Sequence, residues 1–119
     1  SLMFRGLRQP PSIRFFLRRT FGSGAIDETL YRCAIAASRA PGAEHAPLAF
    51  ISGRLFSADI RTIYEALTQP VFLGHGTRGA FADFSEARWT AGRPNWRVKP
   101  YDTGAMPHVE RPTAFAADL

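Results

Sequence analysis

The sequence has few of the features that would identify a disulfide-rich, membrane-spanning or secreted protein. Cys33 is its one cysteine, so no disulfide can form within the chain, which fits a reducing compartment. No apolar run approaches the roughly 20 residues of a membrane-spanning helix, and the first residues lack the apolar segment and cleavage site of a secretory signal. We therefore expect a cytoplasmic protein that does not associate with a membrane.

Lysine is also scarce: Lys99 is the single lysine, whereas the chain has 14 arginines. The net charge is +5. Five of the arginines precede the first acidic residue, Asp27, which could mark a nucleic-acid surface or a transit peptide. Without a recognisable binding module, such arginines more often cover the protein's own core with their stems, so we expect no nucleic-acid partner. These five are Arg5, Arg8, Arg14, Arg18 and Arg19.

The histidines and the cysteine form no metal-ligand motif. His45, His75 and His108 are far apart in the sequence, and Cys33 has no second thiolate beside it, so we expect no metal ion. His75 follows an apolar run, where an imidazole bonded to the backbone is ordinary. The apolar neighbours of Cys33 predict a thiol in the core.

Turn and capping residues predict helices in the first half of the chain. Pro11 is tolerated in the first turn of a helix over 13–20. Asp27 is a suitable N-cap for a helix that runs to about Arg39, because apolar residues recur along it at intervals of three and four. The stretch 46–54 is apolar but too short for periodicity to distinguish a helical turn from an extended segment.

A further helix and a strand-helix-strand unit are predicted downstream. Ser57 is a credible N-cap for a helix over 59–67 that carries an apolar stripe. The stretches 70–73 and 96–101 read as strands, and 84–91 can form a helix that crosses between them. In such a βαβ unit the two strands lie parallel, and functional groups gather at their C-terminal ends.

His108 follows the second predicted strand and precedes a final helix predicted over 112–119. An imidazole can take a proton from a nucleophile and return it to a leaving group, provided that a carboxylate orients the ring. His108 is therefore a candidate general base.

Two motifs resemble those of one enzyme family. Residues 108–115, His-Val-Glu-Arg-Pro-Thr-Ala-Phe, resemble the H-x-E-x-P-x-x-F ending of many α/β-hydrolases, in which the catalytic histidine follows the last core strand. Residues 75–78, His-Gly-Thr-Arg, resemble the H-G-x-x turn after the preceding strand. The resemblance implies a partial α/β-hydrolase fold in a single α/β domain, with a helical cap-like region over 1–69 and a βαβα part of the core over 70–119.

The chain departs from the pattern of that family at two places. No G-x-S-x-G nucleophile motif occurs, since Gly22-Ser23-Gly24 has the wrong spacing, and the nucleophile would have to lie upstream. Gly79 stands where many relatives carry the triad acid, which leaves Asp83 as the nearest carboxylate downstream of the strand. Asp83 and Glu86 also fit a capping box that begins the crossover helix, and in some relatives the acid follows an earlier strand.

The resemblance implies hydrolysis of an ester or a similar bond, in which a serine attacks, His108 moves the proton and backbone amides hold the oxyanion. No cofactor or metal would be required. The chain would supply the histidine, with Asp83 as candidate acid, but not the nucleophile, and would be inactive alone. Phenylalanines of the cap-like region could line a substrate pocket or simply pack: Phe15, Phe16, Phe21, Phe50 and Phe56.

Two other interpretations remain open. Residues 74–79 satisfy G-x-G-x-x-G after a strand, and Asp102 lies where a ribose-binding acid would, but the further βα units of a nucleotide-binding fold are missing. The chain could instead be a non-catalytic interaction domain. Because two strands leave an unpaired sheet edge, we expect a homo-oligomer or a complex with a separately encoded N-terminal half.

Overall fold

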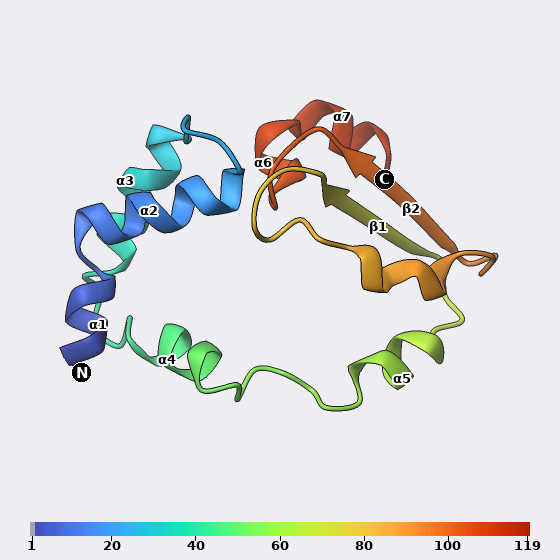
Figure 1. Ribbon diagram of the computed structural model, residues 1–119, viewed down its shortest axis with the longest axis horizontal. Coiled ribbons are helices and arrows are strands. Elements are labelled where there is room, and N and C mark those ends of the chain that lie inside the picture. The colour runs from blue at the N-terminus through green and yellow to red at the C-terminus, as the bar shows by residue number, and fades with distance from the viewer. Residues whose placement is uncertain (1) are drawn as a thin grey trace. The chain divides into compact units, whose positions relative to one another are not determined.

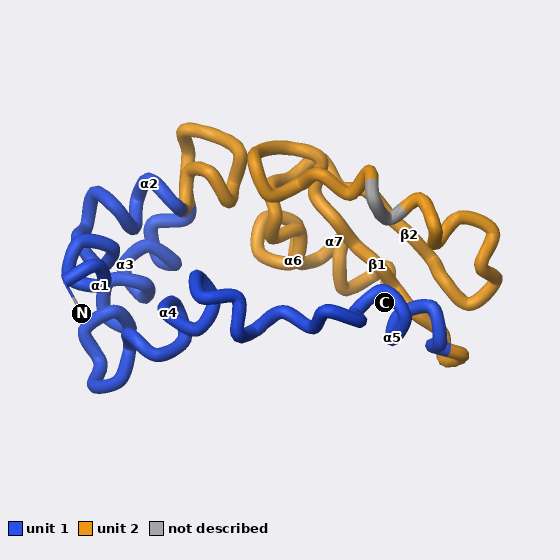
Figure 2. Tube along the Cα trace, turned by 60° about the horizontal axis from the view of Figure 1, so that its bottom comes forward, with its two compact units in different colours: residues 1–16, 27–67 blue, residues 17–26, 68–119 orange. Residues whose placement is uncertain are grey.

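The computed structural model describes residues 2–119, apart from the side chains of Glu86 and Ala87. It shows a mixed structure of several helices and one parallel two-stranded sheet (Figure 1). The chain divides into two compact units (Figure 2). Unit 1 comprises residues 1–16 and 27–67, and unit 2 comprises residues 17–26 and 68–119.

Unit 1 begins with two helices, of which the first is not predicted by the sequence. Helix α1 spans Leu2–Leu7. Helix α2 spans Pro10–Phe21, which confirms the helix predicted over 13–20, and its last residues belong to unit 2. It starts earlier than predicted because two prolines occupy its first turn, where an amide proton would have no partner within the helix.

Helix α3 spans Glu28–Ala37, as predicted, and Asp27 is its N-cap. The Asp27 carboxylate accepts a hydrogen bond of 2.6 Å from the amide of the third residue of the helix. Arg14 of α2 forms an ion pair of 2.8 Å with Glu28, and its guanidinium carbon lies 4.1 Å from the centre of the Tyr31 ring. These contacts join α2 to α3 inside unit 1.

The rest of unit 1 contains two short helices. Helix α4 spans His45–Ile51, so the apolar stretch of uncertain type is helical. Helix α5 spans Ile60–Glu65 with Asp59 in the N-cap position, and the prediction that Ser57 caps this helix is wrong. Since the helix begins one residue later than expected, the Ser57 side chain lies too far from its first free amides, and the Ser57 carbonyl accepts from the Ile60 amide instead.

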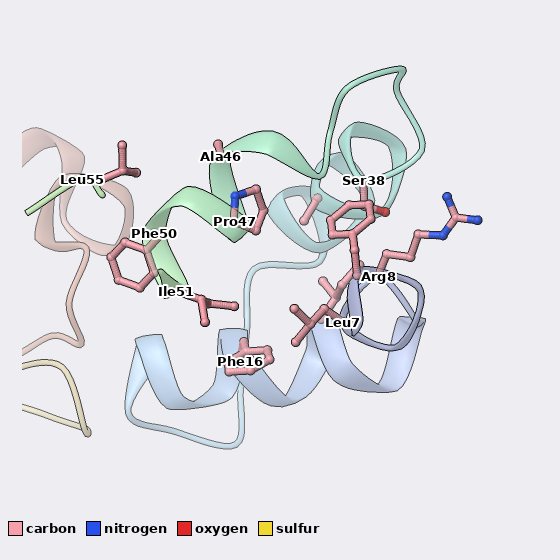
Figure 3. Close-up of a pocket in the computed structure, with 12 residues that line it drawn as sticks. Leu7, Arg8, Phe16, Ser38, Ala46, Pro47, Phe50, Ile51 and Leu55 are labelled. Carbon is pink, nitrogen blue, oxygen red and sulfur yellow. The ribbon is translucent and has the colours of Figure 1, made fainter. Parts of the chain in front are cut away.

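Residues from α1 to α4 surround an apolar groove of about 600 Å³ on unit 1 (Figure 3). Phe4, Leu7 and Phe16 line it from α1 and α2, and Phe50 and Ile51 line it from α4. Two of the five phenylalanines that could form a substrate pocket therefore lie in this groove, whereas three do not line it: Phe15, Phe21 and Phe56.

The sheet of unit 2 consists of two parallel strands, which confirms the predicted pairing. Strand β1 spans Val71–Gly76 and strand β2 spans Trp96–Tyr101, with Val71 opposite Trp96 and Gly76 opposite Tyr101. β1 continues three residues beyond the predicted stretch 70–73, because Gly74, His75 and Gly76 keep their places in the ladder.

The crossover between the strands is not the α-helix predicted over 84–91. It contains one 3₁₀ helix, η1, at Ser85–Thr90, and Gly92 follows it with a φ of 80°. A short segment that starts on an Asp side-chain turn and ends at a left-handed glycine favours the tighter 3₁₀ hydrogen-bond pattern.

Helix α7, Pro112–Ala117, confirms the predicted final helix and covers one face of the sheet. The centre of the Phe115 ring lies 5.7 Å from the ring centres of both Phe72 and Tyr101. A side chain at Gly74 would come within 2.8 Å of the Phe115 ring, so glycine at this position allows the helix to approach the sheet closely.

Among the residues described, few hydrophobic side chains are buried: Phe4 in unit 1, and Phe21 and Tyr101 in unit 2. Cys33 is exposed, so its predicted place in the core is wrong. The half-buried face of α3 runs through Leu30, Ala34 and Ser38, and Cys33 lies beside this face. The spacing of apolar residues in α3 is compatible with either of two neighbouring stripes, and the sequence alone does not show which one is buried.

Candidate functional site

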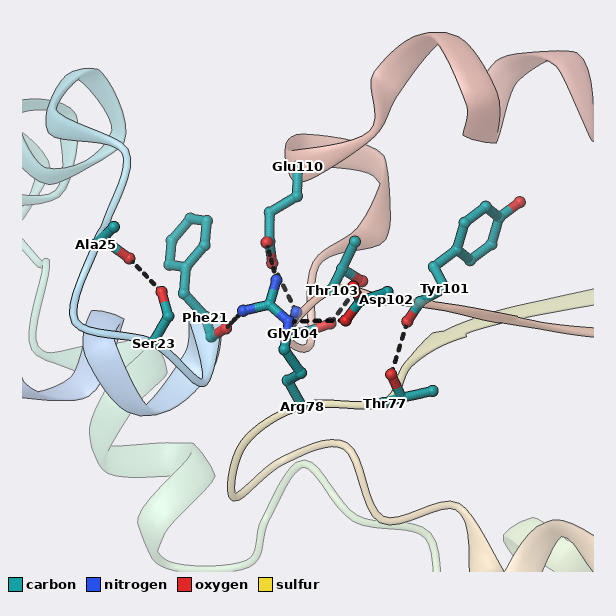
Figure 4. A network of polar contacts seen from close by, with 10 residues as sticks. All are labelled: Phe21, Ser23, Ala25, Thr77, Arg78, Tyr101, Asp102, Thr103, Gly104 and Glu110. Atoms are coloured by element: carbon teal, nitrogen blue, oxygen red, sulfur yellow. Dashed lines mark hydrogen bonds and ion pairs between the residues drawn. The ribbon is translucent and has the colours of Figure 1, made fainter.

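The loops after β1 and β2 meet at the C-terminal ends of the strands, as the parallel arrangement predicts (Figure 4). The amides of Thr77 and Arg78 both donate to the Thr103 carbonyl, at 3.0 Å and 2.9 Å. The Ala105 amide donates to the carbonyl of Thr20, at the end of α2, at 2.7 Å. Three segments distant in sequence are therefore held together by their backbones.

Glycines make this close approach of three backbones possible. A Cβ atom at Gly76 would overlap the Gly104 carbonyl, and a Cβ atom at Gly104 would overlap the Thr20 carbonyl. Gly22 and Gly79 have positive φ values, 61° and 91°, which favour glycine. The two residues also face each other: a Cβ atom on Gly22 would lie 2.6 Å from the Gly79 nitrogen, and a Cβ atom on Gly79 would lie 2.6 Å from the Gly22 Cα. Gly79 thus has a packing role here.

Arg78 is the centre of a polar network between these segments (Figure 4). Its guanidinium contacts Glu110 Oε2 at 2.6 Å and Asp102 Oδ1 at 3.3 Å, and it donates to the Phe21 carbonyl at 3.1 Å. The second oxygen of Glu110 accepts from the Gly104 amide at 2.7 Å. Because both of its oxygens are engaged, Glu110 has a structural role in joining the loops.

His108 lies on a short helix, α6, at Pro107–Glu110, which the sequence did not predict. Its side chain is exposed, and its ring centre lies 5.9 Å from that of Phe115. Within the described part of the chain, no carboxylate forms an ion pair with His108. The general-base candidate is thus accessible but has no orienting carboxylate among the side chains that the structure describes.

Asp83, the candidate triad acid, contacts the backbone at the start of η1. Its Oδ1 accepts a hydrogen bond of 2.9 Å from the Ser85 amide, and this bond lowers the pKa of Asp83 below its usual value. Asp83 therefore closes a side-chain turn one residue before Phe84, the N-cap of η1, so the prediction that Asp83 itself caps a crossover helix is wrong. The Glu86 side chain, the other half of that capping box, lies outside the described residues.

A second polar cluster was not found from the sequence. The Tyr101 hydroxyl donates to Asp118 at 2.6 Å, and Lys99 contacts the same carboxylate at 2.7 Å. Desolvation, together with the Asp118 carboxylate, raises the pKa of Tyr101 to about 12, and Lys99 lowers the pKa of Asp118. The two-residue spacing of Lys99 and Tyr101, which places both side chains on one face of β2, was the available signal.

The glycines at 74–79 do not form a phosphate cradle. Gly74 and Gly76 belong to β1, and the amides of Thr77 and Arg78 are bound to the Thr103 carbonyl. A dinucleotide site uses free amides at the beginning of an α-helix, and the segment after β1 begins no such helix. These glycines instead allow close packing of the loops.

The other histidines have ordinary surroundings. The Nδ1–H of His75 can donate to the Gly76 carbonyl at 2.8 Å, and its ring lies 4.6 Å from that of Phe84, centre to centre. His45 is exposed on α4. Among the side chains that the structure describes, no three of the metal-binding types form a cluster that could hold a metal ion.

No match was found when the chain was compared with protein-family models, with curated proteins and with solved structures. No helix in the described part of the chain is long and apolar enough to cross a lipid bilayer. The resemblance to α/β-hydrolases therefore depends on residues 75–78 and 108–115.

Proposed function

We propose that this chain forms the last two strands of an α/β-hydrolase-like sheet and acts after another polypeptide segment has added strands to β1. In the completed sheet, His108 is the candidate general base, and the nucleophile comes from the added segment. The observation that carries this proposal is the difference between the two free edges of the sheet.

The outer edge of β2 is protected against pairing. β2 contains Arg97, Lys99 and Pro100, and charges and prolines are the residues with which proteins block edge strands. In a parallel ladder the backbone groups of successive residues face alternate sides of the strand. The Val71 amide donates to the Asn95 carbonyl, so the odd-numbered residues of β2 face β1 and the even-numbered residues face outward. The ring nitrogen of Pro100 therefore lies on the outer edge. A further strand on that side would lack one hydrogen bond.

The outer edge of β1 has no such protection. Its sequence, Val-Phe-Leu-Gly-His-Gly, contains neither proline nor an acidic or basic residue apart from His75. By the same alternation, the amides of Phe72 and Gly74 face away from β2. An edge strand with unpaired amides and without such protection is a template for pairing, so this edge favours addition of a strand.

A second copy of the chain can fill this edge by two-fold symmetric pairing of β1 with β1, and an N-terminal half encoded elsewhere can fill it with a different strand. Sedimentation velocity at micromolar concentration tests the first arrangement, for which a dimer is expected. A dimer alone would support the non-catalytic candidate below, because a second copy has no G-x-S-x-G motif and supplies no nucleophile. If the purified chain captures no upstream segment that contains such a motif, the proposal fails.

Proline substitutions identify the edge that pairs. Phe72→Pro removes an outward amide from β1, and Phe72→Ala controls for the loss of the side chain. Val98→Pro and Val98→Ala are the matched pair on β2. We expect Phe72→Pro to weaken association at least tenfold more than Phe72→Ala, and the two Val98 variants to associate equally. The reverse pattern would assign the interface to β2.

The proposed chemistry requires the completed sheet. The chain alone should not hydrolyse p-nitrophenyl acetate faster than an equal concentration of imidazole, because an exposed histidine without a nucleophile or an oxyanion site has little advantage over imidazole. In a complex with the missing segment, His108→Ala should reduce hydrolysis by at least a hundredfold. Hydrolysis that survives this substitution would remove His108 from the mechanism.

A non-catalytic interaction domain is the second candidate. It is favoured by the carboxylates, because Asp83 and Glu110 are both engaged with backbone amides and no carboxylate of the described residues pairs with His108. For this function, assembly through β1 remains and His108→Ala changes nothing. A fluorophosphonate probe that labels no serine in the assembled complex would support the non-catalytic candidate.

A further inference from the structure

Unit 1 combines an apolar groove with unpaired positive charge at one end, and we infer that it binds a single-chain fatty carboxylate. The inference concerns unit 1 by itself and does not depend on completion of the sheet in unit 2.

The groove fits the apolar tail of such a ligand. Its volume of about 600 Å³ lies within the range of roughly 300–1,000 Å³ that is typical of small-molecule sites. Phe16, Phe50 and Leu55 line it, yet 45%, 57% and 60% of these residues' surfaces are exposed. A hydrocarbon chain along the groove would remove this apolar surface from water.

The charge lies at one end of the groove. Arg8 lines the groove and also a neighbouring polar hollow of about 370 Å³, which it shares with Gln9 and Arg39. In Figure 3, Arg8 and Ser38 lie at the end opposite Leu55. Neither Arg8 nor Arg39 forms an ion pair with any residue that the structure describes, so two guanidinium groups lack a counter-charge.

This distribution of charge selects the class of ligand. A nucleic acid needs positive charge along its whole path, whereas the remaining lining of the groove is almost entirely apolar. A carboxylate accepts two parallel hydrogen bonds from a guanidinium, and two arginines can hold one carboxylate. A linear molecule with one carboxylate and an unbranched tail therefore matches both ends of the site.

Calorimetric titration of the full chain with octanoate, decanoate and dodecanoate below their micelle concentrations tests the tail. Burial of each methylene should improve affinity about fourfold, so each step of two carbons should improve it more than tenfold. Ala46→Trp, which places a large side chain in the groove, should abolish this dependence on chain length. Circular dichroism confirms that the variant is folded.

Titration of charge variants tests the head group. Arg8→Gln should weaken dodecanoate binding about tenfold and leave the binding of dodecanol unchanged, and Arg39→Gln should act in the same direction. Arg5→Gln is the matched control, because it removes the same charge from α1 at a residue that lines neither hollow. It should bind like the unmodified chain.

Three results would overturn the inference: equal affinities for octanoate and dodecanoate, equal losses in Arg5→Gln and Arg8→Gln, or binding to phosphatidylglycerol vesicles without any binding of dissolved dodecanoate. The last would indicate a membrane surface in place of a ligand site. A chain that binds dodecanoate but whose β1 edge pairs with neither a second copy nor an added N-terminal half would refute the proposed assembly and leave this inference intact.

Discussion

The contacts inside unit 2 differ in kind from the contacts inside unit 1. In unit 2, backbone groups of distant segments bond directly to one another, and Gly76 and Gly104 permit an approach that no other residue allows. In unit 1, helices surround a groove whose apolar residues, such as Phe50, remain largely exposed. Unit 2 should therefore tolerate little change in shape, whereas unit 1 retains apolar surface for a ligand.

The largest expected effect is that of a methyl group at the junction of unit 2. Gly76→Ala or Gly104→Ala should lower the free energy of unfolding by about 3 kcal/mol or more, because backbone atoms would have to move. Gly6→Ala in α1 meets open space and should raise it by about 0.5–1 kcal/mol. Urea unfolding measures the free energy of unfolding of each variant. Equal changes in the two units would contradict the claim that only unit 2 depends on close backbone packing.

A smaller loss is expected from the Arg78 network. Glu110→Gln removes the charge that faces Arg78 while keeping the size of the side chain, and it should cost about 2 kcal/mol because Glu110 is only 19% exposed. Glu65→Gln breaks the exposed pair with Arg61 in unit 1 and should cost less than about 0.5 kcal/mol. If both substitutions cost the same, the network has no special role.

Alkaline titration distinguishes Tyr101 from the other tyrosines. Since folding raises its pKa from 10.0 to about 12, its contribution to stability is complete below pH 10 and is lost as the pH rises to about 12. The absorbance of tyrosinate at 295 nm should therefore show one late ionisation, which disappears in Tyr101→Phe. An absorbance curve that is the same in Tyr101→Phe above pH 11 would contradict the hydrogen bond to Asp118.

A small effect is also expected for a substitution in the groove of unit 1. Phe50→Ser should change the free energy of unfolding by less than about 1 kcal/mol, because 57% of the surface of Phe50 is already exposed. Thermal unfolding followed by circular dichroism measures the change. A loss as large as that of Gly76→Ala would mean that the groove is part of the folded core.

Local signals in the sequence predicted much of the fold. The carboxylate of Asp27 and the prolines before 13–20 act within one turn of the helices they begin, so α2 and α3 were identified correctly. The apolar run of β1 and its parallel pairing with β2 also follow from sequence pattern. The crossover was wrong because an α-helical pattern over 84–91 does not show that a side-chain turn and Gly92 favour a 3₁₀ helix.

The candidate site was only partly predictable. The sequence placed His108 and Asp102 at the C-terminal ends of the strands, since parallel pairing alone requires this. It did not reveal that Arg78 reaches Glu110, because that contact depends on how two loops fold against the end of α2. The packing role of Gly79 could not be predicted either, because it depends on the backbone of Gly22 beside it.

The bond between Arg78 and the Phe21 carbonyl joins residues 57 positions apart, and this separation has a kinetic consequence. Contacts between distant residues require closure of a long loop before they stabilise anything, so they form late in folding. The helices around Asp27 can form within microseconds, while the junction at the strand ends waits for β1, β2 and the end of α2 to meet. During that interval the unprotected edge of β1 is open to pairing with other unfolded chains, so slow refolding at high concentration should favour aggregation.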